Sequence, residues 1–346
     1  MPSSAASPAD TTRPAGQAEG GPEEGSGDSG VLPPLVVICG PTATGKTALA
    51  LEVADRIGAI EIVSADSRQV YRGMDIGTAK VDAAARARIP HHGLDLVDPD
   101  EPFTAADFQR HATAALRGIA ARGRAALLVG GTGLYLRVVA RGVPVEESGH
   151  DAARRADLER RLARDGLLAL AAVLQRDAPT IASRTDLANP RRVVRALERA
   201  AIHGDRPPPP PAGYPGHVLW LGLAPRPDDH AGWIASRARA QFEAGLVDEA
   251  AALLRRFPPD LRAFSAFGYR EAFGVLDGTL SPADAVERTI LRTRAYARRQ
   301  RTWFRAEPGI TWLEPGPSTT SEAAHLVGRF TEVSGGLGPP ARRPLR

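Results

Sequence analysis

The octapeptide GPTATGKT, residues 40–47, constrains the fold of this chain more than any other stretch. Its spacing, Gly-x-x-x-x-Gly-Lys-Thr, is that of a P-loop, in which glycines allow backbone N–H groups to point at phosphate oxygens. A P-loop requires a buried strand before it and a helix after it. The apolar run LVVIC precedes the motif, and KTALALEVADRI follows it with apolar residues at helical spacing. The segment therefore predicts a strand, loop and helix that bind phosphate groups, and it does not by itself specify ATP.

Strand and helix patterns alternate after the P-loop. A helix is predicted over 104–123, where Thr104 is a favourable N-cap residue. Alternation of this kind is typical of a parallel sheet, whose ligands bind beyond the carboxyl ends of the strands. We therefore expect an α/β fold: a P-loop parallel sheet flanked by helices, with an all-helical insertion domain. Short apolar runs predict further strands within 59–67, 125–133, 217–223 and 309–315.

Composition divides the chain into a core, an insertion and two tails. Residues 1–30 are rich in Pro, Gly, Ala and Ser, and they lack the charged start and apolar middle of a signal peptide. Only helical patterns occur between 151 and 204, and the proline run at 206–211 is a stiff linker. We expect a disordered tail at 1–32, a P-loop core at 33–142 and 205–315, a helical insertion at 143–204, and a loose C-terminal tail at 316–346.

Composition also restricts the cellular setting. No apolar run approaches the ~20 residues that a membrane helix needs, so we expect a soluble protein without a membrane partner. The single cysteine, Cys39, cannot form an internal disulfide, which fits a reducing cytoplasm, and we expect a monomer. The formal net charge is +4, and residues 1–30 carry an excess of acids, so the remainder is more basic still. This balance favours an anionic partner.

The P-loop supplies the first candidate site residues. Arginine outnumbers lysine throughout the chain, so the retention of Lys46 in the loop indicates a need for its compact ammonium. The Thr47 hydroxyl is a candidate Mg²⁺ ligand, and the helix that follows favours phosphate through its dipole. The candidate diphosphate-binding residues are Gly40, Pro41, Thr42, Ala43, Thr44, Gly45, Lys46 and Thr47.

Two more candidates follow other predicted strands. P-loop kinases and NTPases usually place an Asp at the end of a second strand to hold Mg²⁺, but the strand AALLV runs into GGTG without an acid. The acid is Asp66, after IEIVSA, and its carboxylate could ligate Mg²⁺, act as a general base or cap the next segment. Thr132, on the GGTG turn, could bond a reactant or act as a helix N-cap.

A basic helix near the C-terminus is the remaining signal. In SPADAVERTILRTRAYARRQRTWFR no acid occurs between Arg288 and Arg305, and aromatic residues lie among the arginines. This pattern suits an RNA backbone with unpaired, stacked bases, although a solvated basic face is the alternative. AFGYRE, residues 266–271, offers a Gly-Tyr-Arg corner that could stack on a base and contact a phosphate. Four arginines share one helical face: Arg294, Arg298, Arg301 and Arg305.

Seven stretches, taken in order, resemble the motif series of a known family, the bacterial tRNA dimethylallyltransferases. The resemblance covers roughly residues 35–313 and includes the helical insertion. It implies transfer of a dimethylallyl group from dimethylallyl diphosphate to the exocyclic amine of the adenosine on the 3′ side of the tRNA anticodon. The stretches are GPTATGKT, SADSRQVYRGMDIGTAK, HHGLDLVDPDEPFTAADF, VGGTGLYLRVV, NPRRVVRALE, AFGYRE and RRQRTWFR.

The resemblance also implies roles for individual residues. The P-loop and Mg²⁺ would hold the diphosphate leaving group, while Asp66 matches the family's general base. Thr132 matches a residue near the acceptor base, and Arg237 matches an arginine that assists the departing diphosphate. One turn before Arg237 this chain has Trp233, where relatives often have arginine. The positions that match tRNA contacts are Ser67, Arg68, Gln69, Arg191, Arg192, Arg195, Gly268, Tyr269, Arg270, Arg298, Arg299, Arg301, Trp303 and Arg305.

Three other functions remain compatible with parts of the sequence. A P-loop small-molecule kinase would use the phosphate loop, but it leaves the basic helix and the missing strand-end acid unexplained. A free adenine-nucleotide isopentenyltransferase would share the core chemistry and have little use for a basic insertion. A non-catalytic RNA-binding module would leave the P-loop without a role. Prenyl transfer to tRNA is the function that uses all of these features together.

Overall fold

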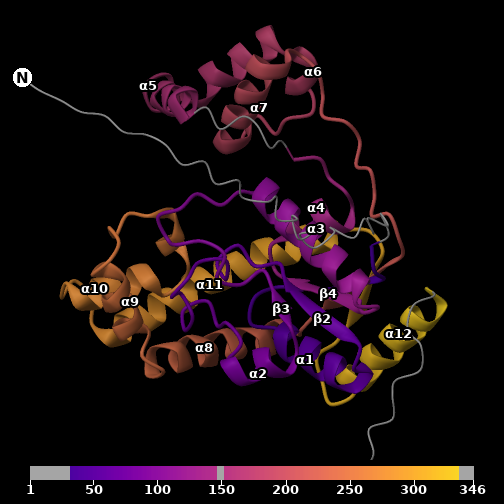
Figure 1. The fold of residues 1–346 in the computed structure, drawn as a ribbon. Helices are drawn as coiled ribbons and strands as arrows, with labels where there is room; N and C mark the ends of the chain where they lie inside the picture. Colours follow the sequence, from indigo (N-terminus) through magenta and orange to yellow (C-terminus); the bar gives the residue numbers. More distant parts are fainter. Residues whose placement is uncertain (1–31, 146–151, 335–346) are drawn as a thin grey trace, which may run out of the picture. The chain divides into compact units, whose positions relative to one another are not determined.

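The computed structural model describes residues 32–145 and 152–334, in which a parallel sheet is covered by helices (Figure 1). The expected α/β fold is therefore confirmed. The expected N-terminal tail, 1–32, lies outside the described residues apart from Leu32. Among the residues described, no helix combines the length and the apolar character needed to cross a bilayer.

The sheet has the strand order β3-β2-β4-β1-β5-β6, and every pairing is parallel. β1 lies at the centre, where Val37 is opposite Leu128 on one side and Trp220 on the other. The strands that the sequence predicts are all present. The sequence does not predict β3, because a two-residue edge strand carries no pattern. In the described ranges the strands are β1 (Leu35–Cys39), β2 (Ile60–Ser64), β3 (His91–His92), β4 (Ala125–Gly130), β5 (Val218–Leu223) and β6 (Ile310–Leu313).

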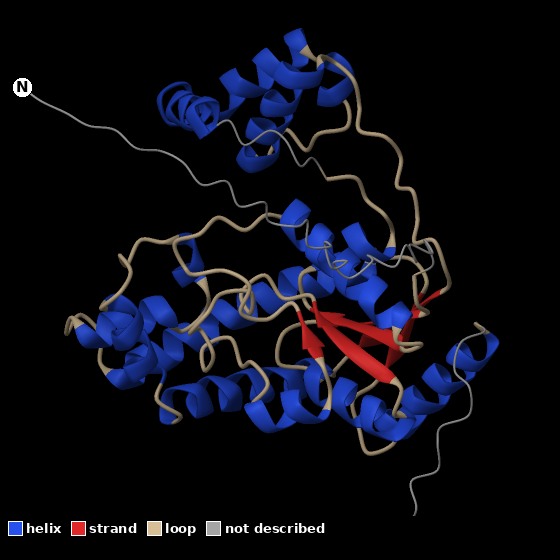
Figure 2. Ribbon diagram, in the orientation of Figure 1, coloured by secondary structure: helices blue, strands red, loops and turns tan. Residues whose placement is uncertain are grey.

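Helices connect the strands and cover both faces of the sheet (Figures 1 and 2). The predicted N-cap at Thr104 is confirmed, since its hydroxyl accepts a hydrogen bond from the N–H of Asp107 in a capping box. In the part of the chain that the structure covers, the helices are α1 (Lys46–Ile57), α2 (Ala83–Arg88), α3 (Ala105–Ala121), α4 (Gly133–Ala140), α5 (Ala152–Asp177), α6 (Pro179–Ala182), α7 (Pro190–His203), α8 (Pro227–Glu243), α9 (Leu246–Leu254), the 3-10 helix η1 (Arg262–Ser265), α10 (Tyr269–Leu276), α11 (Pro282–Arg305) and α12 (Thr319–Val333).

The two faces of β1 belong to two hydrophobic clusters. Leu35 and Val37 pack in a cluster with residues of α3 and α4, whereas Val36 and Ile38 pack in a cluster with residues of α1 and α12. Because both faces are buried, the strand reads as one continuous apolar run. Burial on both sides fixes the register of β1 and so presents the P-loop at the carboxyl edge of the sheet.

The expected helical insertion contains α5, α6 and α7. α7 begins at a capped N-terminus: the Asn189 side chain accepts hydrogen bonds from the N–H groups of Arg191 and Arg192 at 3.1 and 3.3 Å, and Pro190 lies in the first turn. α5 is interrupted at Gly166, where φ is +82° and ψ is +168°. No strand occurs between 152 and 204, all of which the structure describes.

The chain leaves the core and returns to it through two adjacent linkers. The N–H of Ala212 donates to Gly142 O at 3.1 Å, and the N–H of Gly213 donates to Arg141 O at 3.0 Å. A Cβ on Gly142 would lie 2.4 Å from Gly213 O, so this close approach requires a glycine. The points where the insertion begins and ends are therefore hydrogen-bonded to each other.

The expected loose tail from residue 316 is wrong for the residues that form α12. Ala323 and Val327 of this helix are fully buried in the same cluster as Val53 of α1. The apolar residues repeat every fourth position, which places them on one helical face against the sheet layer. The rest of the expected tail, 335–346, lies outside the described residues.

Candidate active site

The P-loop has an irregular backbone that depends on its glycines. Gly40, Ala43 and Gly45 have φ values of +139°, +61° and +82°. A Cβ on Gly40 would lie 2.8 Å from Leu223 O of β5, so no other residue fits there. Gly45 is the N-cap of α1 and provides no side-chain cap. The first N–H groups of α1 are therefore free of a capping side chain, as an anion-binding helix N-terminus requires.

The side chain of Lys46 folds back onto the P-loop. Its Nζ donates to Pro41 O at 2.6 Å. Burial, and to a smaller extent the nearby guanidinium of Arg237, lower the pKa of Lys46 to about 8, while the Asp66 carboxylate acts in the opposite direction. Two cations and one anion thus meet at this end of the loop.

Thr42 is held by three side chains from α8 and α11. Its N–H donates to Gln300 Oε1 at 2.9 Å, and its carbonyl lies 2.8 Å from His230 Nε2. Arg237 Nη1 donates to Thr42 Oγ1 at 3.2 Å. The Thr42 N–H is therefore engaged with protein, and the N–H groups that this loop presents to a phosphate come from its other residues.

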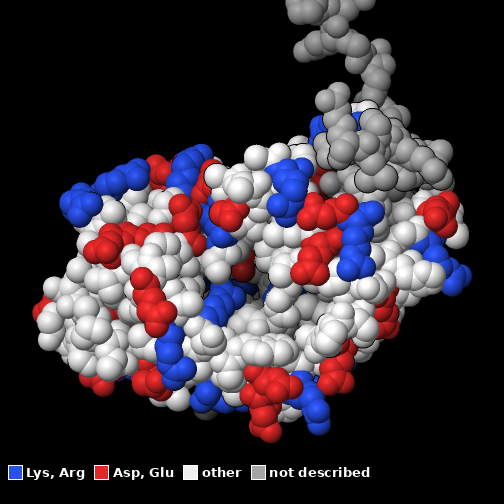
Figure 3. Space-filling model, turned by 90° about the horizontal axis from the view of Figure 1, so that it is seen from below, with Lys and Arg blue, Asp and Glu red and all other residues white. Residues whose placement is uncertain are grey.

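A cavity of about 580 Å³ opens beside the P-loop, within the size range of small-molecule sites. Its walls come from the P-loop, the residues after β2, the segment 77–81, the turn after β4, α8 and α11. Figure 3 shows one face of the molecule, with a central hollow in which Lys or Arg side chains are visible. Among the described lining residues, the charged ones are Lys46, Asp66, Arg68, Arg191, Arg237, Arg292 and Arg299.

Asp66 is the one carboxylate among the described residues that line this cavity. Its Oδ1 accepts a hydrogen bond from the N–H of Arg68 at 2.8 Å, which forms a short local turn after β2. The capping role and the cavity position are thus both present. The turn orients the carboxylate beside the P-loop instead of removing it from the site.

Thr132 occupies the N-cap position of α4, but its side chain makes no capping hydrogen bond. Its Oγ1 instead accepts from the N–H of Ser67 at 3.1 Å. This bond joins the turn after β4 to the turn after β2, next to Asp66. The simple N-cap interpretation is therefore not what the structure shows.

α11 directs some of its arginines at the cavity and others at solvent. Arg292 and Arg299 line the cavity, and the Arg299 guanidinium lies 5.7 Å from the centre of the Tyr296 ring. Arg298 and Arg305 are exposed, and Arg301 is half-buried. None of the four arginines predicted to share one face, Arg294, Arg298, Arg301 and Arg305, is among the described residues that line the cavity, and the two that do line it are other arginines of α11.

Trp303 is braced against α4. A Cβ on Gly133 would lie 2.5 Å from the Trp303 ring, and the Arg137 guanidinium lies 4.5 Å from the ring centre. Glu307, whose side chain is 1% exposed, holds Arg137 through a 2.6 Å hydrogen bond. One face of the Trp303 ring is therefore covered by protein, which limits the stacking expected of it.

The expected base-stacking role of Tyr269 is wrong in this structure. Tyr269 is fully buried, and its ring packs so closely on Gly77 that a Cβ there would lie 2.4 Å away. Gly268 is buried as well, whereas Arg270 is exposed. The glycine-tyrosine corner is therefore part of the core, and only Arg270 of the three faces solvent.

Tyr269 instead helps to fix the backbone of the cavity wall. Its hydroxyl donates to Glu249 Oε1 at 2.6 Å. The Glu249 carboxylate accepts from three successive N–H groups, those of Asp75, Ile76 and Gly77, at 3.0, 2.7 and 3.2 Å. Proximity to this carboxylate and burial raise the pKa of Tyr269 well above its usual range, burial being the larger cause. The pair fixes the backbone that leads into the cavity segment 77–81.

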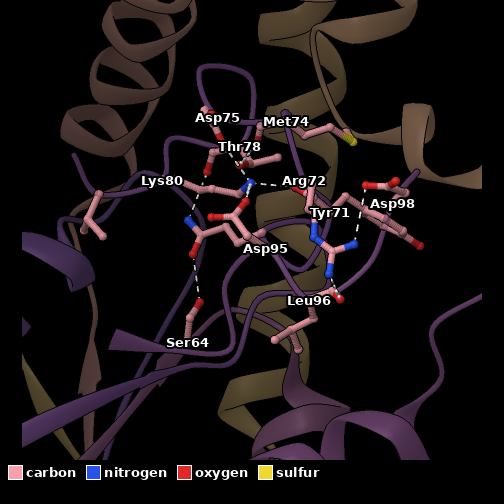
Figure 4. A network of polar contacts seen from close by, with 12 residues as sticks. Ser64, Tyr71, Arg72, Met74, Asp75, Thr78, Lys80, Asp95, Leu96 and Asp98 are labelled. Carbon is pink, nitrogen blue, oxygen red and sulfur yellow. Dashed lines mark hydrogen bonds and ion pairs between the residues drawn. The ribbon is translucent and has the colours of Figure 1, made fainter. Parts of the chain in front are cut away.

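Lys80, for which the sequence indicates no role, is buried in a polar network at the same segment (Figure 4). Its side chain is 1% exposed. Nζ donates to Tyr71 O at 2.6 Å, to Asp75 Oδ1 at 2.8 Å and to Asp95 Oδ1 at 2.5 Å. Arg86 holds the other oxygen of Asp95 at 2.6 Å. The three donors of the ammonium are thus matched by three acceptors.

Two predicted tRNA-contact residues also make internal bonds. Arg68 donates to Arg262 O at 2.9 Å and to Ser265 Oγ at 2.8 Å. Gln69 accepts from Ser64 Oγ at 2.8 Å and donates to Thr78 O at 3.1 Å. Both residues line the cavity, and both connect its walls.

The predicted tRNA contacts of the insertion lie on α7. Arg191 is among the residues that line the cavity. Arg192 pairs with Asp186 at 3.4 Å, and Arg195 pairs with Glu198 at 3.3 Å.

The cavity also contains residues that sequence reasoning did not select. Phe267 and Tyr296 form an aromatic pair with ring centres 5.2 Å apart, and Arg292 lies 5.6 Å from the Phe267 ring centre. Gln300, buried on α11, touches the P-loop. The available signals were an aromatic residue two positions before Tyr269 and a lone Gln among arginines.

The family model described as IPP transferase matches residues 69–307. The tRNA dimethylallyltransferase of Anaeromyxobacter dehalogenans (strain 2CP-1) is 48% identical over 290 residues, covering 81% of this chain and 93% of that protein. The corresponding protein of Roseiflexus sp. (strain RS-1) is 44% identical over 305 residues, covering 86% of this chain and 98% of that protein.

Solved structures agree with these relatives. The tRNA isopentenylpyrophosphate transferase of Bacillus halodurans superposes with a TM-score of 0.65 at 36% identity, covering 87% of this chain and 97% of that chain. A eukaryotic dimethylallyltransferase acting on tRNA superposes with a TM-score of 0.71 at 23% identity, covering 86% of this chain and 79% of that chain, and supports the fold.

Proposed function

The chain belongs to the IPP transferase family, whose curated relatives are tRNA dimethylallyltransferases, and we propose that its reaction takes place in the cavity beside the P-loop. The enzyme transfers a dimethylallyl group from dimethylallyl diphosphate to the exocyclic amine of the adenosine on the 3′ side of the tRNA anticodon, and diphosphate is released. One observation carries the choice of site: Asp66, the one carboxylate among the described lining residues, shares the cavity with P-loop Lys46.

The P-loop binds the diphosphate of the donor. When the allylic C–O bond breaks, the electron pair leaves with the diphosphate, and negative charge increases at the P-loop end of the cavity. Lys46 and Arg237 provide fixed positive charge there, and the N–H groups at the start of α1 add hydrogen bonds. Burial of both cations makes these interactions stronger than they would be in water.

Asp66 acts as the general base for the acceptor. The amine nitrogen of adenine forms the new N–C bond and loses one proton, which passes to the Asp66 carboxylate. The bond from the Arg68 N–H keeps the carboxylate oriented during this transfer. Thr132, two residues beyond β4, accepts from the N–H of Ser67 and therefore lies beside Asp66, where we place it next to the acceptor base.

Mg²⁺ fits the oxygen donors at this end of the cavity. The Thr47 hydroxyl and the Asp66 carboxylate both line it, and Mg²⁺ in proteins is typically held by one or two such groups together with substrate phosphates. Thr47 would hold the ion, which neutralises charge on the diphosphate when it is bound.

The acceptor is a base of the single-stranded anticodon loop. Such loops are recognised by splaying bases out and stacking them on aromatic side chains. Phe267 and Tyr296 supply aromatic rings at the cavity, and the exposed Arg298, Arg305 and Arg270 face solvent as phosphate contacts would. We propose that the enzyme acts as a monomer in the cytoplasm, and its tRNA substrate and the presence of the proposed catalytic groups in one chain support this.

Label transfer tests this function. Radiolabelled dimethylallyl diphosphate is incubated with the enzyme and one of three acceptors: a tRNA with adenosine on the 3′ side of the anticodon, the same tRNA with guanosine there, or free AMP. We expect label only in the first tRNA. Label in AMP alone would indicate free-nucleotide prenylation, and phosphate release from ATP without any label would indicate the kinase alternative.

A further inference from the structure

Gln300 joins two turns that lie side by side at the carboxyl edge of the sheet. Its Oε1 accepts from the N–H of Thr42 in the P-loop at 2.9 Å, and its Nε2 donates to Gly131 O, in the turn after β4, at 2.8 Å. β1 and β4 are paired neighbours, so these two turns follow adjacent strands. One side-chain amide therefore spans the gap between them.

The orientation of the amide is fixed by its partners. Thr42 offers a donor and Gly131 offers an acceptor, so exchanging Oε1 and Nε2 would break both bonds. Gln300 is 6% exposed, and a Cβ on Gly131 would lie 2.5 Å from Nε2. The bridge therefore requires an amide on one side and a glycine on the other.

The two turns carry groups with different tasks. The P-loop holds the donor diphosphate, and the turn after β4 leads directly to Thr132, on the acceptor side. The bridge comes from α11, the helix that also presents Arg298 and Arg305 to solvent. Gln300 is thus the point at which the basic helix contacts both halves of the site.

We propose that Gln300 is a positioning residue that keeps the donor-binding P-loop and the Thr132 turn in register with each other and with α11. The inference rests on the proposed function for the meaning of the two turns. Gln300 does not take part in the chemistry. It sets the distance across which the allylic carbon and the acceptor amine meet.

Substitution of Gln300 tests this role through ligand affinity as well as turnover. Gln300→Met keeps the length and removes both hydrogen bonds. We expect the affinity for inorganic diphosphate, measured by calorimetry on the full chain, to fall about tenfold, equivalent to about 1.4 kcal/mol. We also expect kcat for prenyl transfer to fall at least tenfold, while tRNA affinity changes less than twofold.

Gln109→Met is the matched control. Gln109, on α3, donates from Nε2 to Val138 O at 3.1 Å and does not line the cavity. It loses a comparable side-chain hydrogen bond to backbone outside the site. We expect its diphosphate affinity and kcat to equal those of wild type within twofold.

Gln300→Glu adds a readout that a general packing role would not produce. A protonated glutamic acid has one donor and one acceptor, like the amide, whereas the carboxylate can only accept. The ratio of variant to wild-type diphosphate affinity should therefore rise as the pH is lowered from 8 to 5.5, and the Gln300→Met ratio should stay flat. The charged and ionisable groups near this bridge are Lys46, Asp66, His230, Arg237, Tyr296 and Arg299, and the uncharged Gln300→Met variant reports the pH dependence that they contribute.

The outcomes separate this inference from the proposed function. Wild-type enzyme that binds diphosphate but labels no tRNA would reject the function, and the affinity ratios would still decide the role of Gln300. Active wild type with Gln300→Met matching it in diphosphate affinity, or a flat ratio for Gln300→Glu, would overturn the inference. If Gln300→Met does not fold, Gln300→Leu, which also removes both hydrogen bonds without adding a charge, takes its place in the same affinity measurement.

Discussion

Lys80 Nζ lies 2.5 Å from Asp95 Oδ1, and this ion pair joins the cavity segment 77–81 to the loop that follows β3. Both groups belong to the network that also includes Tyr71 O and Asp75. The compact ammonium satisfies three acceptors that converge on one point. A planar guanidinium cannot reproduce that arrangement, which explains a lysine in a chain whose basic residues, apart from Lys46 and Lys80, are arginines or histidines.

Replacement of Lys80 should therefore reduce stability even when charge is kept. We expect Lys80→Met to lower the free energy of unfolding by about 2 kcal/mol, because Asp95 loses a buried partner, and Lys80→Arg to lower it by about 1 kcal/mol or more. Urea unfolding followed by circular dichroism measures both. Arg160→Met, which removes an exposed pair with Asp157, is the control and should change stability by less than about 0.5 kcal/mol. A Lys80→Arg protein as stable as wild type would contradict the explanation.

Asp66→Asn should abolish proton removal while leaving the site assembled. The asparagine carbonyl can still accept from the Arg68 N–H, so the local turn is preserved. We expect kcat for label transfer to fall at least about 100-fold, since general-base catalysis is typically worth that much or more. Diphosphate and tRNA affinities should stay within a few-fold of wild type. A kcat that falls only a few-fold would remove Asp66 from the role of base.

Diphosphate affinity should decrease as the pH rises through about 8. The pKa of Lys46 is lowered to about 8 by burial and by Arg237, so the ammonium loses its proton above that pH in the free enzyme. Only the protonated form attracts the diphosphate. Calorimetric titrations between pH 7 and 9.5 measure the effect, and Lys46→Met, which cannot titrate, reports the contribution of the ligand's own ionisation. Parallel curves for the two proteins would exclude Lys46 as the titrating group.

The exposed arginines of α11 should affect tRNA binding by neutralising phosphates of the RNA backbone. We expect Arg298→Ala and Arg305→Ala to weaken tRNA binding and to reduce the salt dependence of log K by about 0.7 to 0.9 for each phosphate that is no longer neutralised. Filter binding at several salt concentrations measures this, with diphosphate affinity expected to stay unchanged. Arg329→Ala, at an exposed position on α12, is the matched control. An unchanged salt slope in both α11 variants would place the tRNA elsewhere.

Local patterns predicted the elements that position the site. β1, the P-loop and α1 could be identified because their signals are local. An apolar run, a fixed glycine spacing and a helical periodicity all occur within residues 35–57. The capping residues Thr104 and Asn189 were recognisable for the same reason, since a cap acts on N–H groups two or three residues away.

Contacts between distant segments were not predictable in this way. Tyr269 looked available for stacking, but its burial depends on Gly77, which lies far away in the sequence. Gln300 bridges two turns that become neighbours only when β1 and β4 pair. The helix α12 differs, because its local signal, the four-residue spacing of Ala323 and Val327, is present in the sequence, whereas the composition of the C-terminal segment favours a loose tail.

The paired linkers at Gly142 and Gly213 have a consequence for how this protein is assembled. The points where the chain leaves the core and returns to it are hydrogen-bonded to each other. For the folding of the core, residues 143–212 therefore form a single closed loop. The entropic cost of closing a loop grows only with the logarithm of its length. The entropic cost of closing a loop that contains the whole helical module is therefore only slightly larger than that of closing a surface turn. Changes in the size of that module should have almost no effect on the folding of the sheet.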